Sequence, residues 1–293
     1  MTQAAVGFVG LGLMGAGFTR RLVETGHQVV GFDVDAVKLR AAADWGVAPA
    51  KSAAAVARAC DVVLASVLGS GAQSAVEDVA LGPEGVVAAG GEGKIFVDLS
   101  TTDLETTQRI AAALAKDRGM MFVDAPVSGG PGAAKSGTLA IMAGGTDAAI
   151  ARIAPLMRDL GKMTHMGPVG TGQATKLVNQ TLVLTNYCVL AEALRLAQAH
   201  GVDARKIPEA LAAGHAGSNL LAAVFPQMLA EDFAPRGFAR QVLKDLELLQ
   251  AAARERHLAM PMASQALTLY RLLVAAGKSE LDATAVVTLY PKP

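Results

Sequence analysis

Short apolar runs alternate with longer amphipathic segments along the first half of the chain. The apolar runs are rich in valine, isoleucine and phenylalanine, as is typical of buried strands, whereas the segments between them have helical periodicity. The predicted strands are residues 4–9, 28–32, 62–66, 95–98, 121–124, 139–143 and 162–166. The predicted helices are residues 15–24, 36–45, 52–59, 102–118 and 146–160. This alternation predicts an α/β domain whose mostly parallel sheet is covered by helices on both faces.

Beyond residue 165 the pattern is helical, and no further strand is predicted. The longest segment, residues 171–200, would span about 45 Å as a helix. Shorter helices are predicted at residues 204–213, 218–230, 240–256, 260–276 and 282–289. Because Gly167-Pro168-Val169-Gly170 interrupts the chain at this change, we predict two domains, residues 1–165 and 166–293. The second would be all-α, built around the long helix, whose many apolar faces also predict a subunit interface.

Charge and composition narrow the classes of partner. Lys+Arg and Asp+Glu number 26 each, so no basic excess attracts nucleic acid or an anionic membrane surface. Hydrophobic residues make up 52% of the chain and charged ones 18%, which favours a well-buried, oligomeric globule. We expect no transmembrane helix, because no stretch of roughly 18 apolar residues occurs. We also expect no signal peptide, because the N-terminal segment has no basic start and is interrupted by glycines.

The cysteines and histidines predict neither disulfides nor metal ligands. Cys60 and Cys188 lie far apart in sequence, each among apolar neighbours, and are interpreted as reduced core residues of a cytoplasmic protein. The five histidines show no i, i+4 pairing and no neighbouring cysteine. No metal site is therefore predicted.

A glycine-rich turn joins the first predicted strand to the first predicted helix. Its sequence is Gly10-Leu11-Gly12-Leu13-Met14-Gly15. Gly10 would permit the tight turn, Gly12 the close approach of a pyrophosphate, and Gly15 the packing of helix on strand. The anion would then lie at the helix N-terminus, where free N–H groups point. The turn predicts a dinucleotide site that includes all six residues.

Asp33 directly follows the second predicted strand. A carboxylate at this place accepts hydrogen bonds from the adenosine ribose hydroxyls and repels a 2′-phosphate. The sequence therefore favours NAD, with NADP as the alternative cofactor. Asp35 is the competing candidate and is interpreted as an exposed turn residue.

Ser100-Thr101-Thr102 follows the strand predicted at residues 95–98. It would lie at the carboxyl end of the sheet, where open α/β sheets bind ligands. Thr101 or Thr102 could equally cap the next helix. Both roles are compatible, because a capping hydroxyl can also face the nicotinamide ribose.

Ser128-Gly129-Gly130 follows the strand predicted at residues 121–124. Consecutive N–H groups of two glycines, with the serine hydroxyl, form a nest for a small anion such as a carboxylate. The alternative is a plain turn at a strand end. We predict a substrate carboxylate site here.

Lys176 lies near the start of the long predicted helix, within Gly170-Thr171-Gly172-Gln173-Ala174-Thr175-Lys176-Leu177-Val178-Asn179-Gln180. Alcohol oxidation by a nicotinamide cofactor needs a group that accepts the hydroxyl proton. Burial beside a positive charge lowers the pKa of a lysine, which suits general acid/base catalysis. Asn179 and Gln180, three and four residues on, share its helix face and would hold substrate oxygens. Lys244 could reach the site or form a surface ion pair.

Four ordered sequence blocks resemble those of the β-hydroxyacid dehydrogenase family, which includes 3-hydroxyisobutyrate dehydrogenase and tartronate semialdehyde reductase. The resemblance covers essentially the whole chain. The blocks are Gly7-Phe8-Val9-Gly10-Leu11-Gly12-Leu13-Met14-Gly15, Asp124-Ala125-Pro126-Val127-Ser128-Gly129-Gly130, the Gly170–Gln180 segment and Leu243-Lys244-Asp245-Leu246.

The resemblance implies a Rossmann domain followed by an all-α domain that shares an interdomain helix, assembled as a homodimer or homotetramer. It implies that Lys176 is catalytic, that Ser128, Gly129, Gly130 and Asn179 hold the substrate, and that Thr101 contacts the cofactor. Lys244 would line the cleft near the nicotinamide. The implied reaction interconverts a short β-hydroxy acid and its semialdehyde.

Two departures from the family pattern leave the substrate open. Val67-Leu68, followed by Gly69-Ser70-Gly71, replaces the usual Leu-Pro of a loop that borders the cofactor. Gln180 replaces a second asparagine and is more similar to tartronate semialdehyde reductases or threonate dehydrogenases. A threonate-type or other hydroxy-acid dehydrogenase is therefore an alternative, as is a non-catalytic dinucleotide-binding module. Two enzyme classes that share the architecture are less favoured. Imine reductases usually lack a lysine at the position of Lys176, and 6-phosphogluconate dehydrogenase needs a longer second domain.

Overall fold

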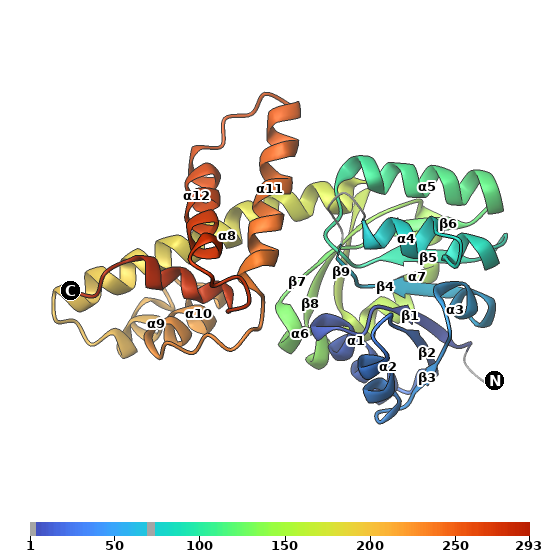
Figure 1. The fold of residues 1–293 in the computed structure, drawn as a ribbon, viewed down its shortest axis with the longest axis horizontal. Coiled ribbons are helices and arrows are strands. Elements are labelled where there is room, and N and C mark those ends of the chain that lie inside the picture. The colour runs from blue at the N-terminus through green and yellow to red at the C-terminus, as the bar shows by residue number, and fades with distance from the viewer. Residues whose placement is uncertain (1–3, 69–73) are drawn as a thin grey trace. The chain divides into compact units, whose positions relative to one another are not determined.

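The computed structural model describes residues 4–68 and 74–293, which form two compact units, Met1–Lys176 and Leu177–Pro293. The first is an α/β unit and the second is helical (Figure 1). This confirms the predicted fold class. The long helix α8 (Thr171–Ala199) begins in the first unit and continues into the second.

One nine-stranded sheet forms the centre of the first unit, in the order β3-β2-β1-β4-β5-β6-β8-β7, with β9 paired to β8. The strands are β1 (Val6–Val9), β2 (Val29–Phe32), β3 (Val47–Pro49), β4 (Val62–Ala65), β5 (Ile95–Asp98), β6 (Met121–Asp124), β7 (Val127–Ser128), β8 (Leu139–Gly144) and β9 (Gly161–Gly167). Pairing is parallel from β3 through β6, and β8 runs antiparallel to β6. The carboxyl ends of β1, β2, β4, β5 and β6 therefore lie along one edge.

Helices of the first unit are α1 (Leu13–Glu24), α2 (Ala36–Ala43), α3 (Ala53–Ala59), α4 (Ala75–Leu81), α5 (Leu104–Arg118), α6 (Gly130–Ser136) and α7 (Asp147–Leu160), with a 3₁₀ turn η1 (Val86–Ala89). Successive strand residues alternate between two cores. Phe8 and Leu64 pack with the α1 and α7 side, whereas Val9 and Val63 pack with the α3, α4 and α5 side. Because a strand turns alternate side chains to opposite faces, both faces are buried.

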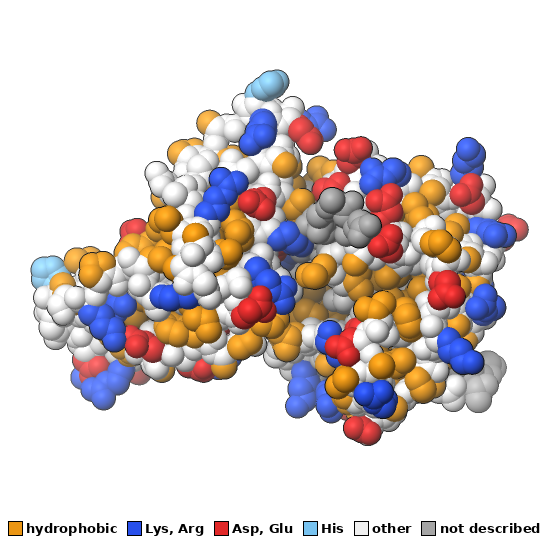
Figure 2. All heavy atoms as spheres, viewed as in Figure 1, with side chains coloured by type: hydrophobic (Ala, Val, Ile, Leu, Met, Phe, Trp, Pro, Cys, Tyr) orange, Lys and Arg blue, Asp and Glu red, His pale blue; other side chains and the backbone are white. Residues whose placement is uncertain are grey.

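The second unit contains α9 (Ile207–Leu211), α10 (Asn219–Leu229), α11 (Ala239–Glu255) and α12 (Pro261–Ala275), with 3₁₀ turns η2 (Ala204–Lys206) and η3 (Ala283–Leu289). They pack around their own apolar core, which includes the fully buried Phe225 and Tyr270. Figure 2 shows acidic and basic side chains interspersed on the visible face, in keeping with the balanced charge. Among the described residues no helix is long and apolar enough to cross a membrane.

Several short elements were not predicted from the sequence. β3 has three residues and ends in Pro49 at the sheet edge, where a proline needs no ladder donor. β7 and α6 occupy the segment interpreted as a loop around Ser128 to Gly130. Such short elements carry too few residues to display a periodicity.

Candidate active site

The glycine-rich turn joins β1 to α1 with a distinct geometry at each glycine. Gly10 has φ +92°, and a Cβ there would lie 2.3 Å from the Ser66 carbonyl oxygen, so only glycine fits. A Cβ at Gly15 would lie 1.9 Å from the Gly10 oxygen, whereas one at Gly12 would meet nothing within 4 Å. The open space is at Gly12, the N-cap of α1, where no side chain caps the helix. A pyrophosphate would fit this place, with the first-turn N–H groups as donors.

Asp33 lies beside this turn at the carboxyl end of β2. Its Oδ2 accepts a hydrogen bond from the Leu11 N–H at 2.6 Å, and its Oδ1 accepts one from the Asp35 N–H at 2.8 Å. The carboxylate is thereby fixed against the glycine-rich turn and retains lone pairs for further donors. Asp35 instead caps α2 through the Val37 N–H at 2.9 Å.

The ends of β4 and β5 are joined by the hydroxyl of Ser100. Its Oγ accepts from the Val67 N–H at 3.0 Å, and the Ser100 N–H donates to Asp98 Oδ1 at 2.9 Å. The segments that contain Val67 and Thr101 are therefore connected by a hydrogen bond. The side chain of Leu68 is half exposed. Gly69-Ser70-Gly71 lies outside the described residues.

The predicted helix cap at Thr101 or Thr102 is wrong. Asp103 caps α5, because its carboxylate accepts from the Thr106 N–H at 2.7 Å. Thr102 is buried and donates its hydroxyl to Asp98 Oδ2 at 2.7 Å. An aspartate next to two threonines competes well for the cap position.

Asp124, at the end of β6, is a buried carboxylate that was not predicted as a site residue from the sequence. Its Oδ1 accepts from the Gly170 N–H and its Oδ2 from the Gln173 N–H, both at 2.8 Å. Burial raises the pKa of Asp124 from its ordinary value of 3.8 to about 6. The two backbone donors oppose this rise in pKa, and the neighbouring Asp98 adds to it.

Lys176 lies within the first unit, near the segment that carries Ser128. Its side chain is buried, with 7% of the residue exposed, and its Nζ donates to the Val127 carbonyl oxygen at 2.8 Å. Ser128 ends β7, and Gly129 and Gly130 begin α6 with φ of +132° and +72°. The structure therefore brings Lys176 and the predicted carboxylate-binding residues together.

The remaining predicted site residues of the second unit, Asn179, Gln180 and Lys244, are linked by hydrogen bonds and an ion pair through Asp245. Asn179 Nδ2 donates to Gln180 Oε1 at 2.9 Å, and Gln180 Nε2 donates to Asp245 Oδ2 at 2.5 Å. Asp245 Oδ1 forms an ion pair with Lys244 Nζ at 2.9 Å. Since an ionised carboxylate only accepts, Asp245 fixes the amide orientation of Gln180, and Gln180 in turn fixes that of Asn179.

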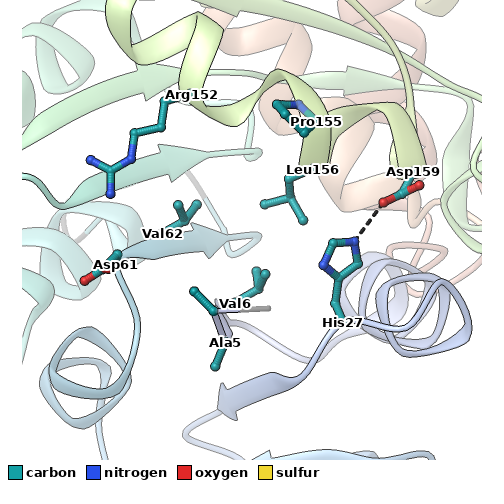
Figure 3. Close-up of a pocket in the computed structure, with 10 residues that line it drawn as sticks. Ala5, Val6, His27, Asp61, Val62, Arg152, Pro155, Leu156 and Asp159 are labelled. Atoms are coloured by element: carbon teal, nitrogen blue, oxygen red, sulfur yellow. Dashed lines mark hydrogen bonds and ion pairs between the residues drawn. The ribbon is translucent and has the colours of Figure 1, made fainter. Parts of the chain in front are cut away.

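A pocket lies at the amino ends of the parallel strands β1 and β4 (Figure 3). Asp33 and Asp124 lie at the opposite edge of the sheet, at the carboxyl ends of β2 and β6. The wall of the pocket includes the buried His27, whose Nε2 lies 2.7 Å from Asp159 Oδ2. None of the predicted site residues lines it. Within the described part of the chain, no group of three or more histidine, cysteine or acidic residues could hold a metal ion.

Two family sequence models match the chain. Residues 5–213 match the NAD binding domain of 6-phosphogluconate dehydrogenase, and residues 170–290 match the NAD-binding domain of NADP-dependent 3-hydroxyisobutyrate dehydrogenase. The chain belongs to the β-hydroxyacid dehydrogenase family and is an NAD(P)-dependent oxidoreductase.

Named relatives cover nearly the whole chain. The 2-hydroxy-3-oxopropionate reductase of Escherichia coli is 34% identical, over 96% of this chain and 95% of its own. The 2-(hydroxymethyl)glutarate dehydrogenase of Eubacterium barkeri is 33% identical, over 97% and 94%. A solved structure of 3-hydroxyisobutyrate dehydrogenase from Salmonella typhimurium superposes with a TM-score of 0.88 at 28% identity, covering 98% of this chain and 100% of that one.

The relatives differ in the cofactor that their descriptions print. The NAD-dependent L-serine dehydrogenase of Pseudomonas aeruginosa is 33% identical, over 97% of both chains. A solved structure described as a complex with NADP⁺ and 2-OPP has a TM-score of 0.89 at 26% identity, over 97% of this chain and 99% of that one. Family membership therefore fixes the cofactor class, NAD(P), and not the choice within it.

Proposed function

We propose that this enzyme interconverts a short β-hydroxy acid and its semialdehyde, with Lys176 as the general acid/base. The observation that carries the proposal is the buried Lys176 ammonium group, held at the Val127 carbonyl beside Ser128. The relatives that act on 2-hydroxy-3-oxopropionate and 3-hydroxyisobutyrate by name support this substrate class.

In the oxidation direction, neutral Lys176 Nζ accepts the proton of the substrate hydroxyl while a hydride leaves the carbon that bears this hydroxyl. The bound nicotinamide supplies the hydride acceptor. In the reduction direction, protonated Lys176 donates that proton to the carbonyl oxygen. Ser128, Gly129, Gly130 and Asn179 would hold the substrate carboxylate and orient the reacting carbon.

We further propose that NAD is preferred over NADP. The carboxylate of Asp33 is held beside the glycine-rich turn by the Leu11 N–H, where it would repel a 2′-phosphate. The remaining cofactor contacts would come from Gly10 through Gly15, Val67, Leu68, Thr101 and Lys244.

Exposed apolar side chains on α8 support assembly with a second copy of the chain. Leu182, Val189 and Leu196 recur every seven residues and are 62%, 47% and 63% exposed. Residues at this spacing form one stripe along a helix. A homodimer or homotetramer that buries the stripe would dissociate when Leu182 and Val189 are replaced by glutamate, as sedimentation velocity would measure.

Purified enzyme should be assayed with NAD and NADP against glycerate, 3-hydroxyisobutyrate, 4-hydroxybutyrate, threonate and serine. We expect the highest kcat/KM with NAD and one of the short β-hydroxy acids. A preference for threonate would favour the threonate-type alternative. Tight cofactor binding with no turnover of any of them would favour a non-catalytic module.

A further inference from the structure

Gln173 lies three residues before Lys176, and both the oxygen and the nitrogen of its side-chain amide form hydrogen bonds. It lies in the first turn of α8 and is 1% exposed. Its Oε1 accepts from the Thr102 N–H at 3.1 Å, and its Nε2 donates to the Ser100 carbonyl at 2.9 Å. One amide therefore holds the residues on both sides of Thr101, which we expect to contact the cofactor.

The backbone of the same residue is held by a second strand end. The Gln173 N–H donates to Asp124 Oδ2, while Asp124 Oδ1 accepts from the Gly170 N–H. These are N–H groups that a helix start leaves without intrahelical partners. The turn also packs closely against the end of β6, because a Cβ at Gly172 would lie 2.4 Å from the Asp124 carbonyl oxygen.

Lys176 follows Gln173 by three residues on the same helix, so both project from one face. Any rotation or translation of the first turn would move the lysine with it. The Gln173 side chain thus links the strand end at Ser100–Thr102 to the helical turn that carries the ammonium group. All of these residues belong to the first unit.

We propose that Gln173 is a positioning residue that sets the separation between the cofactor-contacting strand end at Thr101 and the ammonium group of Lys176. Asp124 supports this function by capping the same turn. The inference rests on the proposed role of Lys176 as acid/base. Proton transfer in step with hydride transfer needs both partners placed closely, and a misplacement of about 1 Å can cost about 10²-fold in rate.

The test substitutes Gln173→Met, which keeps the length of the side chain and its helix propensity. We expect kcat to fall about 10- to 100-fold, while the Kd for NAD, measured by fluorescence titration, changes less than about threefold. Gln108→Met is the matched control, because Gln108 is an exposed glutamine of α5 in the same unit. It should leave both quantities unchanged.

Combination with Lys176→Ala separates positioning from general destabilisation. If Gln173 acts through Lys176, Gln173→Met should lower kcat no further in the Lys176→Ala background. Should the methionine variant not fold, Gln173→Asn keeps the amide on a shorter side chain and must show the same non-additivity.

Two results would overturn the inference. In the first, Lys176→Ala alone has a strongly reduced kcat, and the reductions in kcat from the two single variants multiply in the double variant. Lys176 would then remain the acid/base, but Gln173 would not act by positioning it. An unchanged kcat in Lys176→Ala alone would reject the acid/base role and this inference with it.

Discussion

The Lys176 ammonium group donates to the carbonyl oxygen of Val127 at 2.8 Å, in the residue directly before Ser128. Two segments far apart in sequence, the short strand β7 and the second turn of α8, thereby meet at one point. A substrate whose carboxylate binds at Ser128 would present its hydroxyl carbon near the ammonium group.

Ser128→Ala should therefore weaken substrate binding. Loss of one hydrogen bond to a charged group typically costs about 1.5–3 kcal/mol, or roughly 10- to 100-fold in KM. The Kd for NAD should stay within about threefold. Ser136→Ala, at the other end of α6, is the control. If the affinities for NAD and for substrate fall equally, the segment that contains Ser128 binds the cofactor rather than the substrate. Gly129→Val is a poorer test, because φ there is +132° and a Cβ would lie 2.6 Å from Ala133 Cβ.

Asp33→Ala should reduce kcat/KM for NAD by about 10-fold or more, which corresponds to about 1.4 kcal/mol or more. Activity with NADP should change less, because the repulsion of a 2′-phosphate is removed. The matched control is Asp35→Ala. It removes the side-chain cap of α2 and should leave the NAD/NADP ratio unchanged. A ratio that favours NADP in the unmodified enzyme would reject the assignment.

Gln180→Met should raise KM for the hydroxy acid by severalfold, because Asn179 then loses the partner that fixes its amide. The effect should be absent when Asn179→Ala is already present, since both act on the same substrate contact. Gln250→Met is the control in the same unit, at a partly exposed glutamine that donates to Ser264 Oγ. Equal KM values for wild type and Gln180→Met would show that the chain through Asp245 does not orient the substrate.

The buried Asp124 predicts a pH-dependent stability. Its pKa is raised from 3.8 to about 6, so the folded state binds the proton more tightly than the unfolded state. This contribution to stability is fully present below pH 3.8 and is lost as the pH rises through about 6. Asparagine does not titrate. The Tm of wild type relative to Asp124→Asn should therefore rise when the pH is lowered from about 7.5 to about 4.5. A relative Tm that falls over this range would contradict the shift.

The sequence predicted the elements that are long or completely buried. Strands such as β1 and β5 were predicted because both faces are apolar. The glycine-rich turn was predicted because its spacing is tied to a strand-to-helix junction. Both rest on local patterns.

Other features depend on contacts between distant positions. Gln173 bonds to Asp124 and Thr102, which lie 49 and 71 positions away, so a glutamine in a helical pattern gave no signal of its burial. Asp124 was named only as the first residue of the family-like sequence block that contains Ser128. The cap of α5 was misassigned because three adjacent residues could each serve as the cap.

The measurement that tests the central claim most directly is the pH dependence of kcat for Lys176→Ala. We expect kcat to fall about 10²–10⁴-fold and the limb of the profile that belongs to the lysine to disappear, with NAD affinity retained. Lys176→Arg should recover little activity, because a guanidinium group stays protonated. A variant whose KM rises while kcat and its pH profile persist, together with loss of turnover in Lys244→Ala, would contradict the account and assign the proton transfer to Lys244.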